Sequence, residues 1–249
     1  MTLHLLKPHW PAPAHVHACI TTRQGGVSQA PFASFNLGMH VADKEADVRK
    51  NRDLLMEQAL LPSEPIWLNQ THTNKVVCLD NEALFSSRVP LNADASYTTQ
   101  ANKVSLIMTA DCLPLLVCNK QGTQVAAIHA GWKGLAAGII ENTLMHFKQD
   151  PCEILVYLGP AIGPDSFEVG TDVLQAFTSH DTKARQAFKH TNGEKYVANL
   201  YLLATQRLQA LGVKAIWGAQ YDTFTQEDTF FSYRRDGKTG RMASLIWFE

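Results

Sequence analysis

The residues best suited to chemistry are a thiol and an imidazole, Cys112 and His129, at the open end of a predicted β-hairpin. Within 113–128, two strand-like runs surround a short polar turn that contains glycine, which is the pattern of a hairpin. The residue numbers of two directly opposed residues add up to 241, whether the loop is two residues long (120–121) or four (119–122). Cys112 is therefore predicted to lie directly opposite His129, with Cβ atoms about 4.5–5.5 Å apart.

A thiol beside an imidazole is either a nucleophile with its base or a pair of metal ligands. The spacing does not decide between these two roles. Single buried cysteines and histidines more often serve only in packing, and it is the predicted pairing that favours chemistry here. Asp111, next to Cys112, could orient an imidazole or cap a turn.

Both faces of the predicted hairpin are apolar, which predicts a layered sandwich that buries the sheet on two sides. One face carries Leu113, Leu115, Val117 and Ile128, and the other carries Leu116, Cys118, Val125 and Ala127.

Eight short motifs, spread in order over nearly the whole chain, resemble those of one known family. They are Thr22-Arg23-Gln-Gly-Gly-Val-Ser28, Asn36-Leu-Gly38, Gln70-Thr-His72, Ala93-Asp-Ala95, Thr109-Ala-Asp-Cys-Leu-Pro114, His129-Ala-Gly-Trp-Lys-Gly134, Gly159-Pro160 and Phe231-Ser-Tyr-Arg-Arg235. The chain is thereby identified as similar to the YfiH family, also called the laccase-domain, polyphenol oxidase or purine nucleoside phosphorylase family.

The resemblance implies a third group in the site. In the family, the motifs that begin Gln-x-His, Ala-Asp-Cys and His-Ala-Gly-Trp hold a metal, and their ligands correspond to His72, Cys112 and His129. Zinc is the implied ion, with copper as the alternative because it outcompetes zinc for such ligands. Three protein ligands leave one position for water or substrate, as in catalytic zinc sites.

The implied activity is phosphorolysis of purine nucleosides (adenosine, inosine, guanosine and methylthioadenosine), together with deamination of adenosine. Two alternatives remain open. One is a hydrolase or amidase that uses Cys112 and His129 and acts in peptidoglycan-precursor editing, since the family fold is similar to that of the cytotoxic necrotizing factor deamidase. The other is a laccase-like copper oxidase, against which the single His-x-His pair, His15-Val-His17, argues.

Phosphorolysis needs groups that bind phosphate and a group that holds the purine. By residue type, the candidates are Arg23, Asn36, Arg52 and Lys133, with Trp132 able to stack on a base. Each of them equally suits an ordinary structural role in an ion pair, a turn or the core.

The chain departs from the family pattern in two places. Thr73 stands where the family often has glycine, and this change is expected to be harmless. Asp222-Thr223 stands where the family usually has Cys-Thr, so Asp222 either replaces that cysteine or has no role.

The elements that must position these residues follow a mixed order. A helix from Asp43 or Asp47, either of which could cap it, to about Leu60 follows a strand that ends near Thr21. An amphipathic helix is predicted over Leu135–Phe147 from its apolar spacing. Further strands are predicted at Pro65–Leu68, Val76–Leu79, Val104–Met108, Ile154–Leu158 and Ala215–Trp217, a helix at Asn199–Leu211, and a final hairpin from Phe230–Tyr233 and Met242–Trp247.

This order predicts an α+β protein, an α/β/β/α sandwich with mixed sheets like that of the YfiH family, in a single domain over 1–249. With 22 basic and 23 acidic residues the net charge is -1, which argues against nucleic acid or anionic membranes as partners. Five widely spaced cysteines argue against a disulfide framework. A cytoplasmic monomer acting on small molecules is expected.

Overall fold

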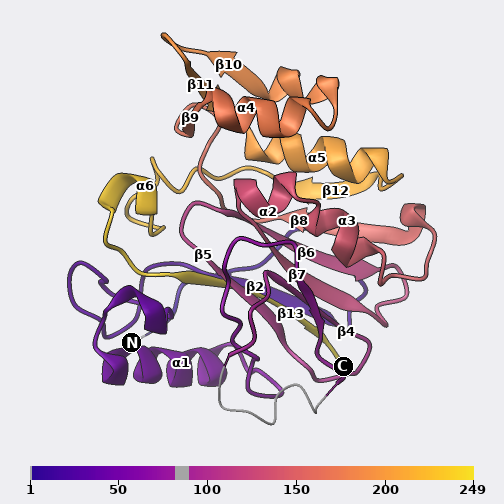
Figure 1. Cartoon of the computed structure of the whole chain (residues 1–249). Coiled ribbons are helices and arrows are strands. Elements are labelled where there is room, and N and C mark those ends of the chain that lie inside the picture. The colour runs from indigo at the N-terminus through magenta and orange to yellow at the C-terminus, as the bar shows by residue number, and fades with distance from the viewer. Residues whose placement is uncertain (1, 82–89) are drawn as a thin grey trace.

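The computed structural model describes residues 2–81 and 90–249, and it has the predicted α/β/β/α layers. In Figure 1 the helix α1 lies below one sheet, a second sheet lies above the first, and α2, α3 and α5 lie above the second. The α+β class and the mixed sheets are therefore confirmed.

The first sheet has the strand order β1-β2-β13-β5 and is antiparallel throughout. Its outer face is covered by α1 (Glu45–Gln58), which follows a short 3-10 helix, η1 (Met39–Val41). The strands are β1 (Leu5–Leu6), β2 (Val16–Thr21), β5 (Ser105–Thr109) and β13 (Met242–Phe248).

The second sheet has the order β12-β8-β6-β7-β4-β3 and is mixed, with parallel pairs at both edges. Its central strands, β6 and β7, are buried along their whole length. The strands are β3 (Val76–Cys78), β4 (Ala95–Thr98), β6 (Leu113–Asn119), β7 (Val125–Ala130), β8 (Ile154–Leu158) and β12 (Ala215–Gly218).

The upper layer contains helices and a small antiparallel sheet of order β10-β11-β9. Asn199 caps α5 as predicted, because its side chain accepts a hydrogen bond from the Leu202 N–H. The elements are α2 (Trp132–Ala136), α3 (Ile139–Leu144), η3 (Pro151–Glu153), β9 (Glu168–Gly170), α4 (Thr171–Thr178), η4 (Thr182–Ala187), β10 (Phe188–His190), β11 (Lys195–Ala198) and α5 (Leu200–Ala210). The short helix α6 (Tyr233–Asp236) lies to one side of the sheets in Figure 1.

The two faces of the β6–β7 hairpin enter two different cores, as predicted. Leu113, Leu115, Val117 and Ile128 pack beneath the helices of the upper layer. The alternate residues Leu116, Cys118, Val125 and Ala127 pack between the two sheets. Period-two alternation therefore assigned every one of these side chains to its face.

The predicted register of this hairpin is wrong by two residues. His129 pairs with Pro114 rather than with Cys112, so the residue numbers of opposed residues add up to 243 rather than 241. The loop covers 120–123, because the Asn119 side chain accepts hydrogen bonds from the Thr123 and Gln124 N–H groups and extends the turn. A shift of two residues preserves the face of each side chain, so Cys112 and His129 still share the inter-sheet face.

Two other predicted elements differ from the structure. The helix expected over Leu135–Phe147 is broken into α2 and α3, because Gly138 adopts φ +88°, a left-handed conformation that interrupts the helix. The expected terminal hairpin does not form: its first half contains α6, and β13 pairs instead with β2 and β5.

Smaller corrections concern the region before the site. Pro65–Leu68 is not a strand, and Asn69 forms only an isolated bridge with Asn92. Neither Asp43 nor Asp47 caps α1, whose N-cap residue is Lys44, without a side-chain cap. Among the described residues, no helix is long and apolar enough to cross a membrane.

Candidate metal centre

Three side chains from distant segments meet at one end of the layer between the two sheets. His72 lies in the loop before β3, Cys112 directly precedes β6, and His129 lies in β7. Their candidate ligand atoms all lie within 4.8 Å of one another. Cys112 Sγ is 3.7 Å from His72 Nε2, and the two imidazole rings meet edge to face with centroids 4.8 Å apart. Tertiary structure thus brings together the set that the resemblance implied.

The geometry of this cluster suits a tetrahedral metal ion. Zinc bonds of about 2.0–2.1 Å to nitrogen and 2.3 Å to sulfur put tetrahedral ligand atoms about 3.6 Å apart. The observed separation of sulfur and nitrogen is 3.7 Å. Two imidazoles and one thiolate are also a donor set that zinc accepts, with one position left for water or substrate.

Asp94, fully buried directly before β4, organises two of the three side chains. Its carboxylate accepts from the Nδ1–H of His129 at 2.8 Å, which directs Nε2 of that ring toward the cluster. It also accepts from the N–H groups of Thr71, His72 and Thr73, and from the Thr73 hydroxyl. One carboxylate therefore holds both the His72 loop and the His129 ring.

The protonation of the cluster follows from these contacts. Burial by itself raises the pKa of Asp94, but the hydrogen bonds from His129 and Thr73 outweigh it and lower the pKa to about 2. Burial likewise opposes ionisation of Cys112 and His129, yet their mutual attraction lowers the pKa of the thiol and raises that of the imidazole. Cys112 is therefore disposed to be a thiolate, the form that binds metal or attacks a substrate.

The backbone around the cluster adopts unusual conformations to present these side chains. His72 and Asp111 both have positive φ, 61° and 92°, where residues other than glycine are uncommon. Gly131 leaves room for the site, since a Cβ there would lie 2.8 Å from the His72 ring and 3.0 Å from Cys112 Sγ.

Asp111 does not orient an imidazole. Its carboxylate accepts from the Thr223 hydroxyl at 2.6 Å and from the Arg234 N–H in α6 at 2.7 Å. It therefore anchors the segment before Cys112 to the C-terminal part of the chain.

Asp222, at the family's usual cysteine, has a structural role next to this anchor. It accepts from the Gly163 and Phe224 N–H groups and from the Ser166 hydroxyl, so it holds the loop after β8. Thr73, the other departure, adds a hydroxyl donor to Asp94 that glycine could not provide.

A cavity of about 420 Å³ opens beside the cluster. One wall comes from the end of β5 and from the segment before β13, and the other from the cluster itself, so the cavity lies between the two sheets. It is lined by His40, Gln70, His72, Met108, Thr109, Ala110, Cys112, His129, Tyr233 and Arg241. The volume falls in the usual range for small-molecule sites.

The predicted substrate-binding residues on the N-terminal half do not line this cavity. Arg23 donates to two backbone carbonyl groups and lies over the Phe231 ring. Asn36 is fully buried and bonds to the neighbouring backbone. Arg52 donates twice to one carbonyl group and lies 3.5 Å from the centre of the Trp67 ring. Their contact with a substrate stays a prediction.

The two candidates in α2 also lie outside the lining. Trp132 is half-buried and packs against the core of the upper layer. Lys133 is exposed, with its ammonium group 5.7 Å from the Trp132 ring centre. Their roles in substrate binding likewise stay predictions.

The sequence assigned no role to Asp94, His40, Tyr233 and Arg241, although Asp94 and Tyr233 lie within two of the motifs that carry the family resemblance. For Asp94 a signal existed, because an acid between two alanines at the start of a buried strand must find hydrogen-bond donors. His40 comes from η1, Tyr233 from the start of α6 and Arg241 from the segment before β13, and only the packing of these distant segments brings them to one cavity.

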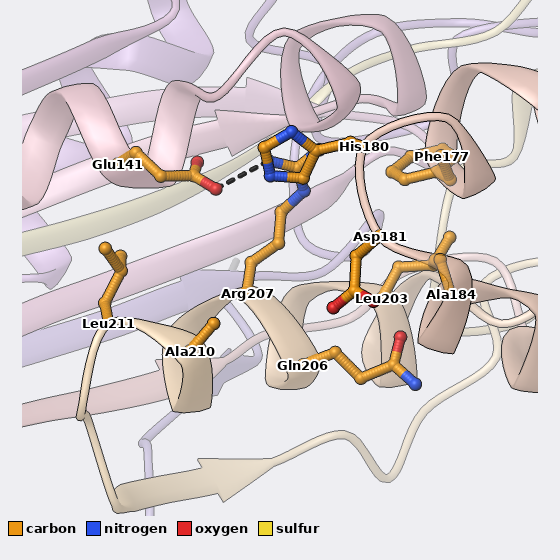
Figure 2. A pocket seen from close by; sticks show the side chains of 10 residues that line it. All are labelled: Glu141, Phe177, His180, Asp181, Ala184, Leu203, Gln206, Arg207, Ala210 and Leu211. Carbon is orange, nitrogen blue, oxygen red and sulfur yellow. Dashed lines mark hydrogen bonds and ion pairs between the residues drawn. The ribbon is translucent and has the colours of Figure 1, made fainter.

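A second cavity, of about 150 Å³, lies in the upper layer and shares no lining residue with the first. Figure 2 shows it between α3, α4 and α5, with Arg207 of α5 reaching the Glu141 carboxylate of α3. The ion pair has an N···O distance of 2.5 Å and links the two helices. None of the predicted site residues lines this cavity.

The fold and the cluster define a class of protein: an α+β sandwich in which three candidate metal ligands meet beside a cavity. The family model described as multi-copper polyphenol oxidoreductase laccase matches residues 17–249, and the chain belongs to this family.

Curated relatives and a solved structure agree with this family assignment. "Purine nucleoside phosphorylase YfiH" of Escherichia coli (strain K12) is 51% identical over 243 residues, 98% of each chain. "Purine nucleoside phosphorylase" of Haemophilus influenzae is 50% identical over 246 residues, 98% of this chain and 99% of that one. A Neisseria meningitidis protein of the DUF152 family has a crystal structure with a TM-score of 0.93 and 48% identity, covering 98% of this chain and 99% of its own. The predicted resemblance to the YfiH family is thus confirmed.

Proposed function

We propose that the chain is a zinc-dependent purine nucleoside phosphorylase that cleaves adenosine, inosine, guanosine and methylthioadenosine with phosphate and also deaminates adenosine to inosine. The observation that carries the proposal is the convergence of His72, Cys112 and His129 at a cavity large enough for a small molecule. The names of the relatives supply the reaction class.

A single zinc ion accounts for the available ligands better than four coppers do. In the described parts of the chain, one group of three or more metal-ligating side chains occurs, whereas a four-copper centre needs several. His72, Cys112 and His129 would hold the ion, and bound zinc would supply Lewis-acid chemistry at an oxygen atom of water or substrate.

The remaining lining residues have separable tasks. Asp94 keeps the Nδ1 proton on His129 and so keeps Nε2 free. Gln70 is hydrogen-bonded to the Met108 backbone through both its amide nitrogen and its amide oxygen, so it braces the cavity wall. Tyr233 is 60% exposed at the rim, where an aromatic ring can stack on a purine base.

We also propose that residues 1–249 act as one domain in the cytoplasm. The support is that the two sheets share one core and that all five cysteines are free thiols, as is usual in a reducing compartment.

The proposal is tested by incubating protein of measured zinc content with adenosine, with and without phosphate, and separating the products by chromatography. Adenine that forms only with phosphate is the expected result for phosphorolysis, and inosine in both samples is the expected result for deamination. Cys112→Ala should lose zinc and turnover together, whereas Cys152→Ala, which alters an exposed cysteine elsewhere, should keep both. If zinc-loaded protein forms neither adenine nor inosine, the proposal is refuted.

A second function, a cysteine hydrolase or amidase, is favoured by one observation. Asp94, His129 and Cys112 are arranged as an orienting acid, a base and a nucleophile. The pKa of Cys112 is lowered and that of Cys152 is raised. In metal-stripped protein at pH 7, iodoacetamide should therefore alkylate Cys112 at least tenfold faster than it alkylates Cys152. Metal-free protein that is active and is inactivated by this alkylation would favour the hydrolase, whereas activity that returns only with zinc would favour the phosphorylase.

A further inference from the structure

The cavity beside the cluster is lined by a guanidinium and by no carboxylate, and the anion in its lining, the Cys112 thiolate, is one of the three groups that would bind the metal. Arg241 is a permanent cation in the lining, and none of the described lining residues is an aspartate or a glutamate. A half-buried guanidinium without a carboxylate partner is costly to desolvate, so a bound anion would stabilise it.

Arg241 also has hydrogen-bonding capacity to spare. Its Nη1 donates to the carbonyl groups of Thr239 and Gly240, both at 3.0 Å. Within the described residues, Nε and Nη2 have no hydrogen-bond partner and Arg241 forms no ion pair. Two anionic groups attract this guanidinium, Cys112 and Asp111. Cys112 belongs to the metal cluster, and both oxygens of Asp111 already accept hydrogen bonds from other groups.

His40 lies beside Arg241 in the same lining. Both side chains pass over Gly38, where a Cβ would lie 2.8 Å from Arg241 Cγ and 3.4 Å from His40 Cε1. Gly38 has an ordinary negative φ, so glycine is needed there for space rather than for backbone conformation. The absence of a side chain at position 38 thus lets an imidazole and a guanidinium share one side of the cavity.

We propose that Arg241 and His40 form the subsite for inorganic phosphate, next to the cluster of His72, Cys112 and His129. The inference rests on the proposed function and adds the residues that bind its anionic co-substrate. Purine nucleosides are neutral, so phosphate is the reactant whose charge the guanidinium complements. A guanidinium edge binds two phosphate oxygens at once, and a neutral histidine donates one further hydrogen bond.

The test measures phosphate and nucleoside dependence separately in zinc-loaded Arg241→Gln, Arg241→Lys and the matched surface control Arg49→Gln. Loss of charge-assisted hydrogen bonds worth about 1.5–3 kcal/mol corresponds to a rise of about 10–150-fold in the phosphate KM for Arg241→Gln. The adenosine KM should change less than about threefold. Arg241→Lys should fall between the wild type and Arg241→Gln, and Arg49→Gln should match the wild type. An unchanged phosphate KM, or an equal rise in both KM values, would overturn the subsite.

A binding measurement separates failure of the subsite from failure of the proposed function. Titration calorimetry with inorganic phosphate on zinc-loaded protein needs no turnover, and it should show binding that weakens at least tenfold in Arg241→Gln. Gly38→Ala keeps both residues but forces the Arg241 side chain to shift, because the added Cβ would lie 2.8 Å from Arg241 Cγ, and it should also weaken phosphate binding. If phosphate binds in this way but no adenine forms, the subsite stands and the phosphorylase proposal falls.

Adenosine monophosphate serves as a second titrant, because the same chemistry could recognise the phosphate of a nucleotide. Arg241-dependent binding of the nucleotide without Arg241-dependent binding of inorganic phosphate would overturn the proposal. Phosphate binding that disappears on removal of zinc and is insensitive to Arg241→Gln would do so as well, because it would place the anion on the metal alone.

Discussion

At the scale of single residues, Asp94 connects parts of the site that are otherwise independent. It accepts five hydrogen bonds, one from the His129 ring and four from 71–73. Buried carboxylates are stable as anions only when donors surround them in this way. A change at Asp94 should therefore alter metal binding and folding together.

Asp94→Asn is expected to weaken zinc binding about 10–100-fold, as is typical when the hydrogen-bond partner of a metal-bound histidine is lost. Metal-free variant should also lose about 2–3 kcal/mol of stability at pH 7, which corresponds to a pKa lowered to about 2 in the folded state. A lowered pKa stabilises the fold above the unfolded pKa of about 3.9, and this stabilisation disappears as the pH falls toward 2. The difference in unfolding free energy between wild type and variant should therefore shrink as the pH is lowered.

Urea denaturation between pH 7 and pH 3, with zinc titrations at pH 7, checks both expectations. Asp172→Asn, which alters an exposed aspartate in the first turn of α4, is the control and should cost less than about 1 kcal/mol. A stability difference that is independent of pH would contradict the electrostatic explanation.

At the scale of elements, the turn between β6 and β7 determines which residues of the two strands face each other. The buried Asn119 side chain accepts from two N–H groups of the turn and donates to the Thr123 hydroxyl. Gly122 has φ +68° and donates to the Asn119 carbonyl. These local contacts select a loop of 120–123, which places His129 opposite Pro114.

Asn119→Ala removes these hydrogen bonds and leaves two turn N–H groups without the side-chain acceptor. The expected cost is about 1–3 kcal/mol of unfolding free energy. Lys120→Ala, one residue further along, loses only an exposed ion pair with Glu153 and should cost less than about 1 kcal/mol. Chemical denaturation of both variants tests the comparison, and equal losses would show that the Asn119 side chain does not stabilise the turn.

At the scale of the whole molecule, the candidate site depends on the packing of one sheet against the other. His129 belongs to the six-stranded sheet, whereas Met108 and Thr109 belong to β5 of the four-stranded sheet. Both sets line one cavity, so its shape depends on the inter-sheet core. The site should therefore be lost when the sheets separate.

Leu116→Ala tests this dependence, because Leu116 is fully buried between the sheets. The substitution should cost about 2–5 kcal/mol, whereas Met145→Ala, at a side chain that is 75% exposed, should change stability by less than about 0.5 kcal/mol. In thermal unfolding followed by circular dichroism and a zinc-sensitive dye, zinc should be released in the same transition as the loss of structure. Release of zinc well before unfolding would contradict the dependence of the site on the inter-sheet core.

The sequence by itself determined those properties that depend on local chemistry. Alternation of apolar residues in 113–128 assigned each side chain to its core, and Asn199 predicted the start of α5. The thiol and imidazoles of the cluster were identifiable from residue type and a family resemblance, whereas the direct pairing predicted for Cys112 and His129 was wrong by two residues. These properties are accessible because side-chain periodicity and helix capping depend on neighbours a few positions away.

Only the tertiary structure decided the register of the hairpin, the role of Asp94 and the lining of the cavity. Each depends on contacts between segments far apart in the chain, such as Asp94 with His129 or Arg241 with Gly38. No local pattern encodes such contacts, because they form only when two sheets and their loops pack together. For the same reason the cations chosen by residue type lie elsewhere, and the cation that lines the cavity is Arg241.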